Sequence, residues 1–159
     1  MPEWISEVSK IVIPGLFVAI ITSIVTVRLS IQRFYEEKWW EKKHEIYTRL
    51  FESLHHLKKY ALEHLETYEN GQDIPENKRK ELNNDWKKFT REFDKLHDLA
   101  SFQLSEEAVK ILDDYKKQKK AAENHENVLD WIDDDAAAAI KCLELLSIEA
   151  KNDLQIKKT

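Results

Sequence analysis

The feature that most constrains this chain is an uncharged, strongly apolar run at residues 11–27, between Lys10 and Arg28. At about 1.5 Å per residue such a helix spans about 25 Å, at the short end for a bilayer core of about 30 Å. The long stems of Lys10 and Arg28 extend that reach, because they can place their charges among the lipid headgroups. We therefore predict a transmembrane helix over residues 10–30, after a short N-terminal tail at residues 1–9, with a lipid bilayer as partner.

Two other interpretations of the run remain open. A secretory signal peptide has a basic start and a small-residue cleavage site, whereas here Glu3 and Glu7 precede the run together with a single lysine. A buried core helix needs a large domain around it, and the rest of this chain is short and highly charged. Both alternatives fit the sequence less well than a membrane span.

Basic residues are distributed unequally about the run. Lys10 precedes it alone, whereas the residues that follow closely include Arg28, Arg33, Lys38, Lys42 and Lys43. Because cytoplasmic flanks carry the excess of Lys and Arg, we expect the N-terminus outside and the C-terminal body in the cytoplasm. The aromatic residues after the run are typical of a membrane-interface belt, although the two tryptophans could equally pack within the body: Phe34, Tyr35, Trp39 and Trp40.

The rest of the chain, residues 31–157, is predicted to be an all-α body. Apolar residues recur there at spacings of three and four, and no alternating segment rich in Val, Ile or Thr follows residue 31. The chain has 2 Gly, too few for a glycine-rich phosphate loop, and 1 Cys, which excludes a disulfide framework. The formal net charge of −5 does not predict DNA binding, which normally requires an excess of basic residues.

Turn and cap residues divide this body into helices. The membrane helix is expected to continue as one rod to the turn at Asn70-Gly71. A second helix is expected over residues 75–100, a third over residues 105–115 with Ser105 as its N-cap, and a fourth over residues 127–154. The charged segment 116–125 is expected to fray or break the third helix. Short connections then predict a bundle of about four antiparallel helices, the first continuous with the anchor.

One face of the predicted membrane helix carries small and hydroxyl side chains. At about 100° per residue these fall within an arc of about 100°, and they are Gly15, Ala19, Thr22, Ser23, Thr26 and Ser30. Bulky residues such as Phe17 and Ile21 fill the opposite side. Small residues at four-residue intervals let helices approach closely, so this face predicts self-association or the lining of a water-filled path. Chance clustering is the alternative, because short patterns of small residues are common.

The same helical step places a polar series near this face beyond the membrane: Arg33, Glu37, Glu41, His44 and Thr48, then Glu52, His55 and Lys59. The apolar stripe at residues 46–61 falls on the other side. A straight helix would make the polar series a continuation of the membrane face, as expected for a homo-oligomeric ring with the first helix innermost. An ordinary surface helix also has a charged face opposite an apolar stripe, and that interpretation stays open.

Carboxylate and histidine spacings do not predict a metal centre or another cofactor. Glu41 with His44 and Glu52 with His55 have the Glu-x-x-His spacing of di-iron bundles. Both pairs lie on one helix and away from its apolar stripe, so they cannot converge in a bundle core.

Two Arg–His pairs with five residues between them are weak catalytic candidates, Arg49 with His55 and Arg91 with His97. A histidine can act as acid or base on a ribose hydroxyl while an arginine holds the phosphate. The spacing resembles that of HEPN ribonucleases, all-helical proteins that pair two such motifs across a dimer. Leu50 and Glu92 follow the arginines where that family tends to have a small polar residue or His. We therefore expect no enzymatic activity.

The whole layout resembles small bacterial single-span proteins with a HEPN-like helical body. The resemblance rests on the membrane helix, on the juxtamembrane segment RFYEEKWWEKKHEIYTRLFESLHHLKKY, and on a short body ending in LSIEAKNDL. Within that set, the chain is similar to the accessory membrane proteins of RNA-targeting CRISPR systems. The resemblance implies a bacterial inner-membrane location, a homo-oligomeric pore, and a cytoplasmic protein or RNA-guided effector as partner.

Together the residues and the resemblance predict a non-enzymatic, membrane-anchored protein that assembles through its first helix, with a pore-forming antiphage role that depolarises the membrane. Two alternatives stay open. One is a membrane-tethered ribonuclease that uses the Arg–His pairs, and the other is a scaffold whose cytoplasmic bundle recruits a partner.

Overall fold

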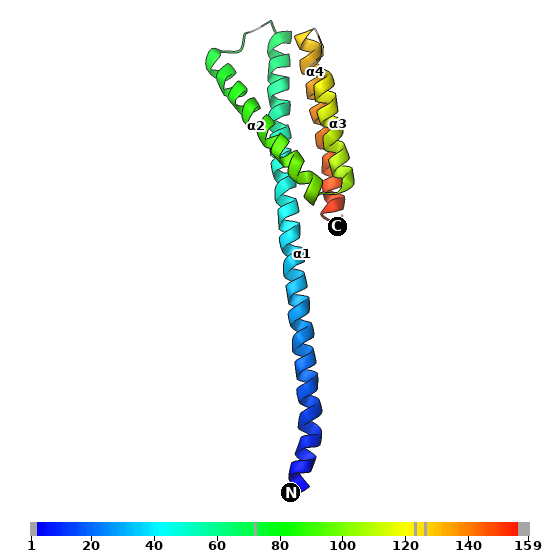
Figure 1. The fold of residues 1–159 in the computed structure, drawn as a ribbon. Helices are drawn as coiled ribbons and strands as arrows, with labels where there is room; N and C mark the ends of the chain where they lie inside the picture. The colour runs from blue at the N-terminus through cyan, green and yellow to red at the C-terminus, as the bar shows by residue number, and fades with distance from the viewer. Residues whose placement is uncertain (1–2, 72, 123, 126, 156–159) are drawn as a thin grey trace. The chain divides into compact units, whose positions relative to one another are not determined.

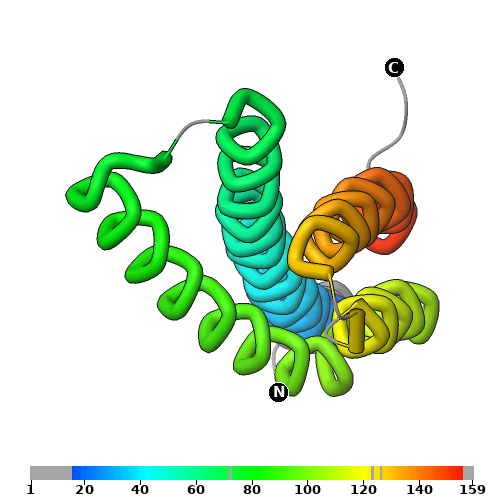
Figure 2. Tube along the Cα trace, turned by 90° about the horizontal axis from the view of Figure 1, so that it is seen from above, coloured from blue at the N-terminus to red at the C-terminus, as the bar shows by residue number. Residues whose placement is uncertain are grey.

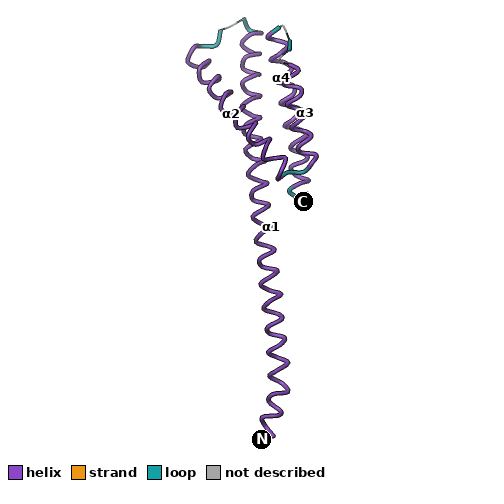
Figure 3. The backbone as a smooth tube through the Cα atoms, in the orientation of Figure 1, coloured by secondary structure: helices purple, strands orange, loops and turns teal. Residues whose placement is uncertain are grey.

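A computed structural model describes residues 3–71, 73–122, 124–125 and 127–155, with side chains described from Leu16 onward. These residues form four α-helices joined by short loops, and no strand occurs among them (Figures 1 and 3). The all-α prediction is therefore confirmed.

The first helix, α1 (Glu3–Glu69), includes the whole apolar run and begins before it. It ends at the predicted turn, where Gly71 adopts φ +62° and its N–H donates to the Tyr68 carbonyl over 3.0 Å. The chain divides into two compact units, Met1–Glu41 and Lys42–Thr159, which are described separately below. This boundary follows contacts within the chain, whereas the predicted boundary at residue 30 refers to a bilayer.

The second unit contains the C-terminal part of α1 together with α2 (Glu76–Gln103), α3 (Glu106–Ala122) and α4 (Val128–Asp153). The predicted cap Ser105 is confirmed, because its Oγ accepts from the Ala108 N–H over 3.1 Å. Asn127 caps α4 by accepting from the Leu129 N–H over 3.1 Å. Each cap supplies an acceptor to a backbone donor that the first helical turn leaves free.

The third helix is longer than the expected residues 105–115, although it ends within the charged segment 116–125. The structure continues α3 through the charged segment to Ala122, which is 1% exposed. Lys117 and Lys120 are exposed, Lys116 pairs with Asp94 of α2 over 3.2 Å, and Ala122 packs inward. Burial of the inner face therefore offsets the repulsion between lysines that lie one helical turn apart in this segment.

Within this unit successive helices run antiparallel. Tyr47 and Asp153, at the start of the α1 part and the end of α4, share a hydrogen bond of 3.0 Å. Tyr60 donates to the Asn83 side chain over 3.3 Å, which joins the later part of α1 to the early part of α2. Seen along the bundle, α2 crosses the others obliquely, whereas α3 and α4 run side by side (Figure 2).

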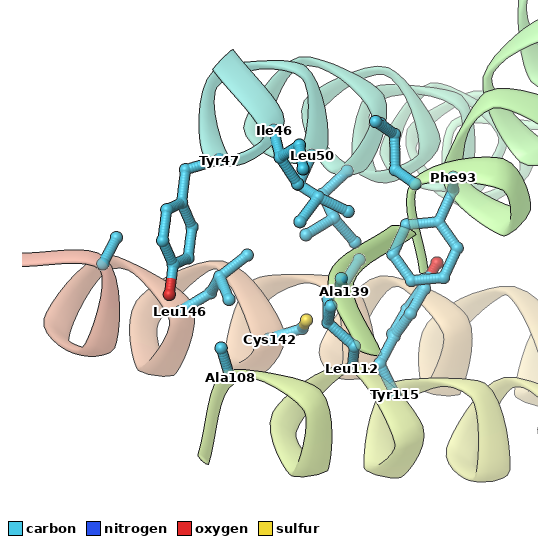
Figure 4. Close-up of a cluster of buried hydrophobic side chains, with 14 of the residues drawn as sticks. Ile46, Tyr47, Leu50, Phe93, Ala108, Leu112, Tyr115, Ala139, Cys142 and Leu146 are labelled. Atoms are coloured by element: carbon cyan, nitrogen blue, oxygen red, sulfur yellow. The ribbon is translucent and has the colours of Figure 1, made fainter. Parts of the chain in front are cut away.

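Leucines from all four helices fill the main core, with Leu50, Leu96, Leu112 and Leu146 all fully buried. Figure 4 shows Leu50, Leu112 and Leu146 in this core together with Phe93 and Tyr115, whose rings contact edge to face at 5.1 Å between centroids. Burial of one such leucine contributes about 2 kcal/mol relative to exposure. The unit is thus held by its own apolar core.

Cys142 lies in the same core and is 3% exposed. Burial raises the pKa of its thiol to about 12. The thiol is therefore neutral at physiological pH and packs as a small apolar side chain.

Candidate functional site

The apolar side chains of α1 between Leu16 and Ile31 remain exposed, with exposed fractions of 60% for Leu16 and 50% for Ile31. A soluble helix of this composition normally buries such side chains in a core. Within the part of the chain whose side chains are described, one helical stretch, Leu16–Glu69, is long and apolar enough to cross a membrane. The described part of α1 from Leu16 onward thus has the length, composition and exposed apolar side chains of a membrane span.

The hydroxyl groups of this segment bond within their own helix. Thr22 Oγ1 donates to the Val18 carbonyl and Ser23 Oγ to the Ala19 carbonyl, each over 2.8 Å. Thr26 and Ser30 donate to the carbonyls four residues earlier over the same distance. Because each hydroxyl donor is satisfied inside the helix, the face can enter an apolar environment without an unbonded hydroxyl hydrogen.

The residues of the predicted assembly face are divided between the two compact units. In the first unit the exposed members are Ala19, Thr22, Ser23, Thr26, Ser30, Arg33, Glu37 and Glu41, while the exposure of Gly15 lies outside what the structure describes. The Glu41 carboxylate forms an ion pair with the Lys38 ammonium over 2.6 Å. In the second unit, His44 and Thr48 are exposed, and Thr48 donates to the His44 carbonyl over 2.9 Å. One continuous face through both units stays a prediction.

Aromatic side chains after the apolar run are also exposed. Trp39 and Trp40 have exposed fractions of 43% and 45%, and Tyr35 has 68%. Phe34 and Tyr35 contact edge to face, and the Lys38 ammonium lies 5.9 Å from the centre of the Phe34 ring. Exposed aromatic rings beside a basic residue are typical of a membrane interface. The exposure of these rings is compatible with the predicted belt, which stays a prediction.

An ionic cluster, hereafter the Asp153 cluster, joins three helices at one end of the second unit. The Asp153 carboxylate accepts from Lys43 Nζ over 2.5 Å, from the Tyr47 hydroxyl over 3.0 Å and from the Ser105 backbone N–H over 3.1 Å. Ser105 Oγ also donates to Glu149 over 2.6 Å. Burial, and then the Asp153 charge, raise the pKa of Tyr47, so its hydroxyl stays a neutral donor. The cluster fixes where α1 enters the body.

The residues of the first Arg–His pair contact different partners within the described chain. Arg49 makes ion pairs with Glu92 on α2 and with Glu45, the latter over 3.5 Å. His55 is exposed, and its ring contacts the edge of the His56 ring at 5.8 Å. The arginine therefore connects α1 to α2, and the histidine points into solvent.

In the second pair, His97 is half-buried and bonds through Nε2 to Asp113 of α3 over 2.7 Å. Its ring centre lies 6.4 Å from that of Phe93. Arg91 is exposed on α2. The hydrogen bonds and ion pairs of the described residues join neither Arg91 nor Arg49 to His55 or His97. His97 is thus a half-buried histidine whose hydrogen bond joins α2 to α3.

Sequence reasoning missed His56 as a structural residue. Its ring stacks on Phe89 with centroids 3.8 Å apart and planes 6° apart. Burial lowers its pKa from 6.5, and the Asp85 carboxylate, 4.0 Å away, opposes that shift. Its partner Phe89 lies on α2, so the local sequence around His56 gives no signal of this contact.

Among the residues that the structure describes, no group of three or more His, Cys, Asp or Glu side chains is suited to hold a metal ion. Comparisons of the chain with protein-family models, with curated proteins and with solved structures find no match.

Proposed function

We propose that this protein is a non-enzymatic membrane protein that is anchored by the N-terminal half of α1 and assembles into a homo-oligomer through the small-residue face of that half. The second unit is then a cytoplasmic body in a bacterial inner membrane protein, with the N-terminus on the other side. The observation that carries the proposal is the exposed apolar segment, in which Ala19, Ser23 and Thr26 lie on one side and larger residues on the other.

The bonding of the hydroxyls supports assembly rather than simple anchoring. Each hydroxyl oxygen keeps lone pairs after it donates to its own helix, and the small side chains let a second backbone come close. A lone span gains nothing from collecting its small side chains on one side, because lipid contacts all sides equally. A helix that contacts a second copy does gain from it.

A pore that depolarises the membrane in antiphage defence is the specific role that we propose for this assembly. In such a pore the part of the small-residue face that the neighbouring copy leaves uncovered would line the path, since its hydroxyl groups can hydrogen-bond water that crosses the bilayer. A cytoplasmic protein, or an RNA-guided effector, is the proposed partner of the body. Neither Arg–His pair is needed for this role.

The test is a membrane-potential measurement in bacteria that express the full chain, with a potential-sensitive dye. The proposal expects depolarisation by the natural chain and its loss when leucine replaces Ala19 and Ser23. The double variant His55→Ala/His97→Ala should depolarise the membrane as strongly as the natural chain does. Depolarisation that depends on those histidines would favour the ribonuclease instead.

Replacement of residues 10–30 by an unrelated single span distinguishes the pore from a scaffold. A pore loses its activity with its lining, whereas a scaffold needs only to be held at the membrane. Full activity in the replaced chain would contradict the proposal.

A further inference from the structure

The second unit has a groove between α1 and α4, hereafter the α1/α4 groove. Its lining is mostly apolar and includes Phe51 and Ala150, while His44, Thr48 and Lys151 are polar members of its rim. Its volume of about 220 Å³ is below the range of about 300–1,000 Å³ that is common for small-molecule sites. The groove therefore suits a protein side chain better than a metabolite.

A large apolar side chain extends this surface along α4. Ile148 is 61% exposed and directly follows Ser147, which lines the groove. A single exposed isoleucine is common on protein surfaces, but this one lies beside an apolar groove. The groove and Ile148 together form an apolar strip that a neighbouring molecule can cover.

The outer face of α2 carries a matching projection. Phe102 is 74% exposed, the largest exposed fraction among the large apolar side chains of the described residues. At about 100° per residue, Phe102 and Asp98 lie on the side of α2 opposite the buried Phe93 and Leu96. Aromatic side chains that enter a pocket of the partner are typical anchors of protein interfaces.

The α1/α4 groove and Phe102 lie on opposite sides of the body. α2 contacts α1 through Glu92 and α3 through His97. α4 contacts the N-cap of α3 through Glu149, and it contacts α1 through Asp153. The four helices thus follow one another around the bundle in chain order (Figure 2). A side chain on the outer face of α2 therefore cannot reach the groove of its own copy.

Both features lie at the same end of the body. The Asp153 carboxylate accepts from Tyr47, which lines the groove, and from the N–H of Ser105, three residues after Phe102. Copies anchored in one membrane share one orientation, so residues at the same height in neighbouring copies can meet. A contact between opposite sides of identical copies is heterologous and can close into a ring.

Charged residues beside the two features have opposite signs. Asp98 lies one helical turn before Phe102, and its side chain is 85% exposed. Lys151 lies on the rim of the groove and is exposed. An α2 helix on the groove of the next copy therefore brings Asp98 and Lys151 to similar positions, where they attract one another.

A second pair of exposed residues, Lys95 and Glu52, lies further from this end with the charges exchanged. The two residues have similar heights, because Glu92, one turn from Lys95, pairs with Arg49, one turn from Glu52. The ion pairs of the described residues include none of Lys95, Lys151 and Glu52. Two pairs of opposite order fix the position of α2 along the groove.

We propose that, in the homo-oligomer, α2 of one copy docks on the α1/α4 groove of the next copy, with the Phe102 ring in the groove. Asp98 then pairs with Lys151, and Lys95 pairs with Glu52. The inference rests on the proposed function, because it assumes the homo-oligomer, and it adds the contact through which the bodies meet. The occupant of the groove is thus a second copy of this chain.

The test is cross-linking of the full chain in membranes with a short bismaleimide. Thr48→Cys/Ser101→Cys places one thiol in the groove and another beside Phe102, whose ring is kept. The two positions lie on opposite sides of one body, so each link joins two copies, and we expect a ladder of linked chains. The natural Cys142 is buried and contributes no link. Ser101→Cys/Val128→Cys is the matched control, because Val128 is exposed at the other end of α4 and should give no ladder.

A charge exchange in the Thr48→Cys/Ser101→Cys chain identifies the contact. Asp98→Lys and Lys151→Asp should each lower the linked fraction several-fold, since each brings like charges together. The two substitutions combined should restore most of the linked fraction. Circular dichroism spectra check that each variant keeps its helix content.

A second comparison tests the aromatic projection. Phe102→Ser should lower the linked fraction several-fold, because it removes the ring from the groove. Val128→Ser, which also removes an exposed apolar side chain, should leave the linked fraction unchanged. Equal effects of the two substitutions would overturn the place of the ring in the groove.

The mass of the detergent-solubilised natural particle separates this inference from the proposed assembly. A particle of several chains, in which Thr48→Cys/Ser101→Cys gives no more links than the control, overturns the docking and leaves the assembly in place. A particle of one chain overturns both. Single charge reversals that the exchange does not rescue overturn the pairing of Asp98 with Lys151. A ladder that persists in Ala19→Leu/Ser23→Leu supports the docking and contradicts assembly through the membrane face.

Discussion

At the scale of single residues, Asp153 is the side chain on which the arrangement of the body depends most. Its side chain is 9% exposed and accepts from α1 and from the start of α3, while it belongs to the end of α4. Charged groups at this depth need all of their partners, because a buried charge without them carries a large desolvation cost. Substitutions here therefore act on three helices together.

Asp153→Asn should lower the free energy of unfolding of the body by about 2 kcal/mol, since it removes the charge that Lys43 and Tyr47 share. Urea denaturation of the detergent-solubilised chain, followed by circular dichroism, measures this change. Asp114→Asn is the control, because Asp114 is 66% exposed and should change stability by no more than about 0.5 kcal/mol. Equal effects of the two substitutions would refute the role of the Asp153 cluster.

His56 should give the body a stability that depends on pH. Burial holds its folded pKa below the ordinary value of 6.5, so the unfolded chain binds a proton more readily than the folded chain. The stabilisation from His56 is therefore fully present above pH 6.5 and is lost as the pH falls through that value toward the lower folded pKa.

The measurement compares the free energies of unfolding of the natural chain and His56→Gln between about pH 8 and pH 5, where histidine titrates. The difference in the free energy of unfolding between the natural chain and His56→Gln should favour the natural chain most at the alkaline end and should shrink as the pH falls. An advantage that grows in acid would mean that the attraction to Asp85 outweighs burial.

At the scale of elements, the sequence predicted most helix ends because their determinants are local. Ser105 and Asn127 bond to donors within the next three residues, and Gly71 adopts its turn conformation with little help from distant residues. The end of α3 was missed because its determinant is distant. Ala122 is buried through tertiary packing, which a charged local composition does not reveal.

Gly71 ends α1 in a left-handed conformation that an alanine adopts at a cost. An added Cβ at this position would meet nothing within 4 Å, so conformational strain is the main expected cost. Gly71→Ala should lower the free energy of unfolding by about 1 kcal/mol. Gly71→Asn should cost less, since asparagine tolerates φ near +60°.

Thermal denaturation of the two variants beside the natural chain measures the difference. An alanine variant as stable as the natural chain would show that the turn rearranges freely. A larger loss for asparagine than for alanine would contradict the conformational explanation.

The features of the candidate site that depend on one short segment could be predicted from the sequence, whereas the contacts between helices could not. The apolar run and its small-residue face follow from the composition and periodicity of one segment, and the structure leaves its described side chains exposed. The contacts of Arg49 with Glu92 and of His97 with Asp113 join residues on different helices. Spacing along the chain could suggest a pair within one helix, but it could not supply partners from another.

At the scale of the whole molecule, we propose that the two units have separate tasks. The body has its own buried core and its own ionic cluster. We therefore expect the body to fold without the first unit. The first unit has exposed apolar side chains and satisfied hydroxyls, which suit a bilayer and a second copy of the same helix. Assembly through the small-residue face is the central claim that connects them.

The most direct test of this claim is the mass of the detergent-solubilised particle, measured by light scattering with the detergent contribution subtracted. The account predicts a defined multiple of the 18.9 kDa chain mass for the natural protein. Ala19→Leu/Ser23→Leu should shift the particle toward a single chain, whereas Ile21→Phe/Ile24→Phe, which adds bulk to the opposite face, should leave the multiple unchanged. A natural protein with the mass of one chain, or one whose assembly is indifferent to Ala19→Leu/Ser23→Leu, would contradict the account.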